Sequence, residues 1–148
     1  MNNIHTEKLV SADDIVRMLD LVPHPEGGYF RETYRDTHSV DGRSVGTAIY
    51  FLLKAGEISR WHKVDAAEIW HFYAGSPLEL GLAEPGKKAQ QLVIGNDLGK
   101  RQLPQYVIPK AWWQQARSLG DWTLVGCTVA PGFEFSGFEM APVGWEPG

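Results

Sequence analysis

Turn-forming residues interrupt this chain at short intervals, and this spacing limits what it can fold into. Gly, Pro, Asn and Asp gather in short clusters such as Asp41-Gly42, Glu84-Pro85-Gly86 and Ala130-Pro131-Gly132. The runs between the turns are rich in apolar, aromatic and β-branched residues and read as strands at 29–35, 46–54, 57–62, 67–73, 78–83, 89–94, 106–108, 122–129 and 133–140. Many short strands joined by turns favour an all-β barrel or sandwich.

A helix is predicted at one place, over residues 11–20. Ser11 can cap its N-terminus, and Asp13 and Asp14 suit the positive end of the helix dipole. Ile15 and Met18 share a face at helical spacing. With 148 residues and no linker or repeat, we expect a single domain over 1–148, with this short N-terminal helix and a β-barrel over 27–141.

Charge and composition exclude several classes of function. The formal net charge is −4 and the isoelectric point near 5.7, and no basic run is present, so we expect no nucleic-acid partner. No apolar run approaches the roughly 20 residues of a membrane helix, and the N-terminus lacks signal-peptide regions. Cys127 is the only cysteine, which excludes an intrachain disulfide. We expect a cytoplasmic protein without a membrane partner.

The segment from Gly56 to Gly75 carries a spaced set of polar residues. Gly56 is followed after five residues by His62, and Glu68 comes six positions later. This spacing resembles the first motif of the cupin superfamily, small antiparallel barrels that hold a metal or a small ligand. The second histidine of that motif is Val64 in this chain.

Two further stretches strengthen the resemblance. Residues 108–114, IPKAWWQ, are similar to the second cupin motif, with Gln114 in place of its histidine and Ala111 in place of the usual glycine. The run from His24 to Arg35, HPEGGYFRETYR, together with IWHFYAGSPLEL, resembles one specific and largely uncharacterised cupin family, a domain of unknown function. The resemblance covers residues 21–141. It implies a double-stranded β-helix, a jelly-roll-like barrel, that is a homodimer with a small-molecule pocket at one mouth.

For chemistry, the resemblance leaves two readings open. Many cupins hold a divalent metal at positions that read His62, Val64, Glu68 and Gln114 here. Altering even an outer-shell group weakens metal binding about 10–100-fold, so losing two ligands should cost on the order of 10²–10⁴-fold. We therefore expect no metal or other cofactor, and a metal on His62, Glu68 and Gln114 is the alternative. Other cupins, such as sugar-nucleotide epimerases, lack metal and use the first-histidine position as a general base.

Strand alternation separates the residues that follow Glu68. Glu68, Trp70 and Phe72 share one face, whereas His71 and Tyr73 share the other. If Glu68 points into the barrel, His71 points away unless a bulge intervenes. The family resemblance nevertheless places His71 with His62 and Glu68 among the catalytic candidates, and we count Tyr73 among the substrate-binding ones.

The remaining candidates for substrate binding are Tyr29, Arg31, Glu32, Gln114 and Glu139. In the strand at 29–35, the face with Phe30 would carry Glu32 inward, whereas Tyr29 and Arg31 lie on the other face. An inward arginine could clamp a phosphate or carboxylate. The alternative is an edge strand whose charges pair on a dimer rim.

These residues lead to three readings of function. The first is a metal-independent isomerase or epimerase for a sugar-like or phosphorylated metabolite, in which His62 moves a proton and Glu68 orients it or acts as the second acid-base group. The second is a non-catalytic module that binds or senses a metabolite, and the third is a metal-dependent cupin enzyme. His62 and Glu68 could also merely satisfy each other's hydrogen bonds.

Overall fold

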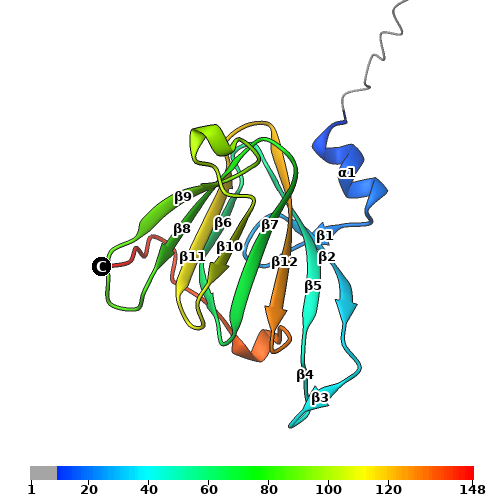
Figure 1. Ribbon diagram of the computed structural model, residues 1–148, viewed down its shortest axis with the longest axis vertical. Helices are drawn as coiled ribbons and strands as arrows, with labels where there is room; N and C mark the ends of the chain where they lie inside the picture. The colour runs from blue at the N-terminus through cyan, green and yellow to red at the C-terminus, as the bar shows by residue number, and fades with distance from the viewer. Residues whose placement is uncertain (1–9) are drawn as a thin grey trace, which may run out of the picture.

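Over residues 10–148, the computed structural model has two antiparallel sheets that face each other across a shared interior (Figure 1). The first contains, in spatial order, β1 (Val22–Pro23), β2 (Tyr29–Arg35), β5 (Thr47–Lys54), β12 (Trp122–Ala130), β7 (Ala67–Gly75) and β10 (Gln105–Ile108). The second contains β13 (Phe138–Met140), β6 (Ile58–Val64), β11 (Trp113–Ser118), β8 (Leu78–Ala83) and β9 (Gln90–Ile94). The prediction of an all-β barrel with a short N-terminal helix is confirmed.

The helix α1 spans Ala12–Met18 and packs against the first sheet near β5 (Figure 1). The Ser11 hydroxyl accepts from the Asp14 backbone N–H, and the Asp14 carboxylate accepts from that of Ser11, as the capping argument predicts. Ile15 and Leu52 form a small cluster beneath the helix, so both faces of β5 are covered. No helix among the described residues is long and apolar enough to cross a membrane.

The predicted strands agree with the structure within a few residues, with four exceptions, one of which is the two-residue strand β1, which was not predicted. Strand β11 was not predicted. The short hairpin of β3 (Ser39–Val40) and β4 (Arg43–Ser44) was also missed. The predicted strand at 133–140 is shorter, because its first half passes through a turn of 3₁₀ helix, η2 (Phe135–Gly137), and only β13 pairs with β6. A second such turn, η1 (Leu98–Lys100), links β9 to β10.

Large side chains fill one end of the barrel interior. Strands of both sheets contribute alternate residues to a buried cluster, which includes Phe51, Trp70, Leu80, Ile94 and Val125. At the opposite end, the inward positions carry polar or smaller side chains, including His62, Val64 and Glu68. The packed end holds the barrel together, and the other end leaves room for a cavity.

A bulge in β2 changes which of its side chains face the interior. Glu32 pairs with Ile49 of β5, and Tyr34, two residues on, already pairs with Ala48. The extra residue reverses the alternation, as bulges do. Glu32 and Arg35 therefore both reach the cavity, and Tyr34 is exposed.

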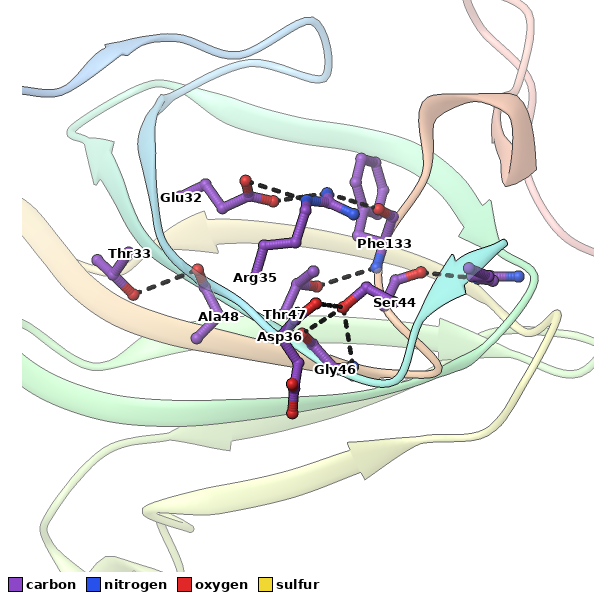
Figure 2. A network of polar contacts seen from close by, with 11 residues as sticks. Glu32, Thr33, Arg35, Asp36, Ser44, Gly46, Thr47, Ala48 and Phe133 are labelled. Carbon is purple, nitrogen blue, oxygen red and sulfur yellow. Dashed lines mark hydrogen bonds and ion pairs between the residues drawn. The ribbon is translucent and has the colours of Figure 1, made fainter. Parts of the chain in front are cut away.

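Residues 131–138, which we call the cover segment, cross the open end of the barrel between β12 and β13. Figure 2 shows part of their attachment: the Phe133 N–H donates to the Thr47 hydroxyl at 2.9 Å, and the Arg35 guanidinium donates to the Phe133 carbonyl at 2.8 Å. Arg43 donates to the Gly132 carbonyl at 2.8 Å. Side chains near the β3–β4 hairpin thus hold the cover segment in place.

Candidate functional site

A cavity of about 370 Å³ lies between the inner faces of β2, β5, β6, β7 and β12 and beneath the cover segment. Its polar groups lie mainly at the inner end and at the mouth, whereas its walls are mostly aliphatic and aromatic. The residues that line the cavity are Asp20, Val22, His24, Glu26, Phe30, Arg31, Glu32, Arg35, Thr47, Ile49, His62, Val64, Glu68, Cys127, Val129, Phe133, Phe135 and Phe138.

His62, on β6, is almost fully buried and is fixed through one ring nitrogen. Its Nδ1 lies 2.7 Å from the Arg60 carbonyl oxygen and 3.0 Å from Oε2 of Glu26. Two acceptors at Nδ1 assign the proton of the neutral ring to that nitrogen. Burial lowers the pKa of His62, with the nearby Glu68 opposing the shift. The ring is therefore neutral at pH 7, and the lone pair of Nε2 is available to a ligand.

Glu26 is buried beside two histidines. Its Oε2 accepts a short hydrogen bond from the Ser59 hydroxyl, and its Oε1 lies 3.3 Å from Nδ1 of His24. Burial raises the pKa of Glu26 to about 8, although the Ser59 hydrogen bond opposes this shift. Burial, followed by the neighbouring His62, lowers the pKa of His24 to about 4. These distances would also suit ion pairs. Because His24, Glu26 and His62 are all buried, however, the three side chains are more stable as neutral, hydrogen-bonded groups.

Glu68, on β7, is held by an amide. The Gln114 side-chain N–H donates to Oε1 of Glu68 at 2.8 Å, and the Gln114 carbonyl accepts from the Trp70 indole N–H at 2.7 Å. Burial raises the pKa of Glu68 to about 7, against the influence of His62. The neighbouring Gln114 amide and Cys127 thiol also oppose this rise in the pKa of Glu68. A carboxyl group that titrates near neutrality can give or take a proton.

A family model described as the cupin superfamily, domain of unknown function 985, matches residues 13–141. The chain belongs to this family. The resemblance found in the sequence motifs is thereby confirmed.

Solved structures and a curated relative agree with this assignment. Protein SO0799 of Shewanella oneidensis is 36% identical, with a TM-score of 0.86 over 90% of this chain and 85% of its own. A hypothetical protein from Leishmania major is 30% identical, with a TM-score of 0.83 over 89% and 88%. Yeast YML079W, an uncharacterised protein of Saccharomyces cerevisiae, is 24% identical over 84% of this chain and 72% of its own. An oxalate decarboxylase variant of Bacillus subtilis, 13% identical with a TM-score of 0.62 over 80% of this chain and 29% of its own, shares the fold.

The metal positions of other cupins do not form a metal site in this one. Val64 offers only hydrocarbon, and the carbonyl of Gln114 already accepts from Trp70. Among residues 10–148, no group of three or more His, Cys, Asp or Glu side chains is placed to hold a metal ion. The residues present therefore do not fit a divalent metal, which needs at least three strong protein ligands.

The cupin cavity brings together four of the predicted site residues: His62, Glu68, Arg31 and Glu32 line it. Gln114 lies behind Glu68 and reaches the cavity only through that carboxyl group. The partner at the His62 ring nitrogen Nδ1 is Glu26, whereas from the sequence we expected Glu68 to orient this ring or to act as the second acid-base group.

The other four predicted residues lie away from the cavity. His71 and Tyr73 are on the outer face of β7, where the His71 ring meets the Thr128 hydroxyl at 2.9 Å. The pairing of β7 with β12 is regular at His71, and the bulge in β7 comes after it, at Tyr73, which stays half exposed, so the bulge turns neither side chain inward. Tyr29 packs with the cluster beneath α1. Glu139 is exposed and lies 3.5 Å from the Lys63 ammonium.

His24 and Glu26 are the site residues that the sequence reading missed, because HPEGG read as a simple turn. That turn is pressed against β6: Gly27 has a φ of +109°, and a Cβ there would lie 2.3 Å from the Ile58 carbonyl oxygen. The Arg60 N–H donates to the Glu26 carbonyl at 2.8 Å. The family-specific character of the run was the available signal, since a plain turn would not need its histidine and glutamate.

Proposed function

We propose that this cupin is a metal-independent isomerase or epimerase that moves a proton on a small molecule bound in the cavity. The observation that carries the proposal is the fixed His62 ring, with Nδ1 held by Arg60 and Glu26 and Nε2 left for a ligand. Glu68 lines the same cavity and titrates near neutral pH. A neutral imidazole and a carboxylic acid form a complementary base and acid.

The proposed reaction takes place next to a carbonyl group of the ligand. His62 Nε2 takes a proton from the adjacent carbon, and the C–H electron pair becomes the new C=C bond. The carbonyl oxygen takes a proton from Glu68 and becomes the enol hydroxyl. In an epimerase, a water molecule on the other face protonates the carbon, and the hydroxide that forms takes the proton from His62. In an isomerase of a β,γ-unsaturated carbonyl compound, His62 returns its proton to the far end of the dienol, which shifts the C=C bond. In both cases the enol hydroxyl returns its proton to Glu68.

Glu26 acts in this proposal as a positioning residue. The His24 Nδ1 accepts from the Glu26 backbone N–H at 3.1 Å, and the protonated Oε1 of Glu26, 3.3 Å away, can share this acceptor. Oε2 of Glu26 accepts from Ser59 and His62. These contacts fix the tautomer and the ring plane of His62 before the ligand binds. Such fixed orientation is a recurring feature of catalytic histidines.

The test is deuterium wash-in measured by NMR. A panel of enolisable ketones and aldehydes is incubated with the protein in D₂O, and exchange at the carbon next to the carbonyl is followed. We expect His62→Gln to lose the catalysed exchange while the ligand still binds. His71→Gln, on the outer face, is the matched control and should retain it. Undiminished exchange in His62→Gln would refute the mechanism.

A binding or sensing module is the second candidate, favoured by one observation. No buried side-chain nitrogen or oxygen lacks a hydrogen-bond partner among the described residues, so the polar cluster can serve structure alone. This candidate predicts saturable binding with no exchange for any ligand. The family resemblance also leads us to propose a cytoplasmic homodimer, which light scattering after size-exclusion chromatography would test.

A further inference from the structure

The chemistry of the cavity walls limits which substrate the proposed reaction can use. Between the polar inner end and the mouth, the lining consists mainly of hydrocarbon side chains, namely Phe30, Ile49, Val64, Val129, Phe133, Phe135 and Phe138. A sugar carries a hydroxyl on most of its carbons, and each needs a hydrogen-bond partner when it leaves water. The one hydroxyl in these walls, that of Thr47, already accepts from the Phe133 N–H, so they offer too few partners for a sugar.

The two cationic side chains of the lining are both directed to other partners. Arg35 contacts Glu32 at 2.6 Å and the Phe133 carbonyl at 2.8 Å. Arg31 lies over the ring of Tyr50, 5.6 Å from its centroid, and Tyr50 belongs to the outer face of β5. Arg35 is therefore paired with Glu32, and Arg31 is held at the edge of the cavity by a ring on the outer face of β5, away from the polar inner end.

The charges at the mouth give an anionic ligand no net attraction. Asp20 and Glu32 line the cavity with carboxylates, and Arg31 and Arg35 line it with guanidinium groups, of which Arg35 pairs with Glu32. The two positive and two negative side chains balance, so a phosphorylated ligand would gain no excess positive charge as it entered. Burying an anion without a partner is costly, so the site favours an uncharged ligand.

Aromatic rings surround the histidines where the reacting group would lie. The His24 ring stands edge-on to Phe30, with centroids 4.5 Å apart, and the His62 ring is tilted against Phe138 at 5.4 Å. Phe135 of the cover segment is 54% exposed at the mouth, although it contacts Phe138 edge-on. A flat apolar ligand would cover the exposed part of Phe135 and complete this aromatic enclosure.

Resting on the proposed function, we infer that the substrate is a neutral, mainly hydrocarbon molecule, aromatic or alicyclic, whose single enolisable carbonyl lies between His62 and Glu68. This inference replaces the sugar-like or phosphorylated metabolite that the superfamily resemblance suggests. It depends on the apolar walls and on the engaged arginines.

The test uses three probes in calorimetric titrations of the full chain. Phenylacetone is neutral and enolisable, 4-(2-oxopropyl)benzoate is the same molecule with an added carboxylate, and glucose 6-phosphate represents the sugar phosphates. We expect saturable binding of phenylacetone, and binding at least about tenfold weaker for the two anions, because their charge loses water without gaining a partner. Equal or tighter binding of either anion would overturn the inference, as would the absence of saturable phenylacetone binding at millimolar concentration.

Two variants locate the binding. Phe135→Ala should weaken phenylacetone binding about tenfold, because the ligand covers this ring. Val143→Ala, which removes an exposed apolar side chain outside the cavity, is the matched control and should bind as the wild type does. An unchanged affinity in Phe135→Ala would place the ligand elsewhere and overturn the inference.

Deuterium wash-in on the same probe separates the two proposals. Binding without exchange would refute the acid-base mechanism and leave the substrate class intact. Exchange on glucose 6-phosphate, lost in His62→Gln, would support the mechanism and overturn the substrate class.

Discussion

Replacing Glu26 by glutamine should change how stability depends on pH. Burial raises the pKa of Glu26 to about 8 from an ordinary value of 4.5, so the folded protein retains a proton that the unfolded chain has released. Ionising the group in the folded state costs free energy, and stability contributed by the neutral form is lost as pH rises from 4.5 through 8. Between pH 6.5 and 8 this loss amounts to about 1.5 kcal/mol.

Other buried groups also change how the free energy of unfolding depends on pH. Glu68, with a pKa of about 7, adds a further loss of about 1 kcal/mol over the same interval. His24 acts oppositely, because its lowered pKa makes stability rise with pH between about 4 and 6.5. The difference in slope between the wild type and Glu26→Gln removes these shared contributions and isolates Glu26.

The assay is urea unfolding followed by tryptophan fluorescence at pH 6.5 and pH 8. The amide can accept from Ser59 and donate to His24 as the protonated acid does, so the fold should survive. Between pH 6.5 and pH 8, the free energy of unfolding should fall by about 1.5 kcal/mol less in the variant than in the wild type. The exposed Glu139→Gln is the control and should follow the wild type. An unchanged slope in Glu26→Gln would show that Glu26 is already ionised at pH 6.5, which would refute the neutral cluster.

Three further predictions concern the core, the amide and the metal positions. Leu80→Ala should lower the free energy of unfolding by about 2–5 kcal/mol in urea, because the side chain is fully buried in the packed end of the barrel. Gln114→Leu should lower it by about 2–4 kcal/mol, since the Trp70 N–H and the Glu68 carboxyl each lose a partner; a loss below 0.5 kcal/mol would contradict the buried amide bridge. Elemental analysis of protein purified without chelators should find far less than one divalent metal per chain, and stoichiometric metal that Glu68→Ala removes would contradict the poor ligand set.

Local patterns predicted the barrel well and parts of the site less well. The helix followed from Ser11 and Asp14, which act within one turn, and most strands followed from their neighbouring residues. Strand β11 was missed because it carries Gln114 and Ser118 inward, where an apolar residue would have marked a strand. The bulge in β2 arises from pairing with β5, which the sequence of β2 alone does not express.

The polar cluster was only half predictable for the same reason. His62 and Glu68 lie in one motif with informative spacing, whereas Glu26 precedes its hydrogen-bond partner Ser59 by 33 residues. Alternation along β7 already indicated that His71 points outward, and family resemblance alone made it a candidate. The fold is thus encoded by periodicity, while the environment of the buried glutamate depends on contacts between distant segments.

The attachment of the cover segment has an evolutionary consequence. Residues 131–138 supply three of the aromatic rings of the cavity but none of the residues of the packed end. Their anchors, including Arg35, Arg43 and Thr47, contact mainly backbone atoms of the segment. Side chains of the cover segment can therefore change without loss of these anchors. Related proteins could acquire new ligand preferences through such changes while the sequence of the barrel strands changes little.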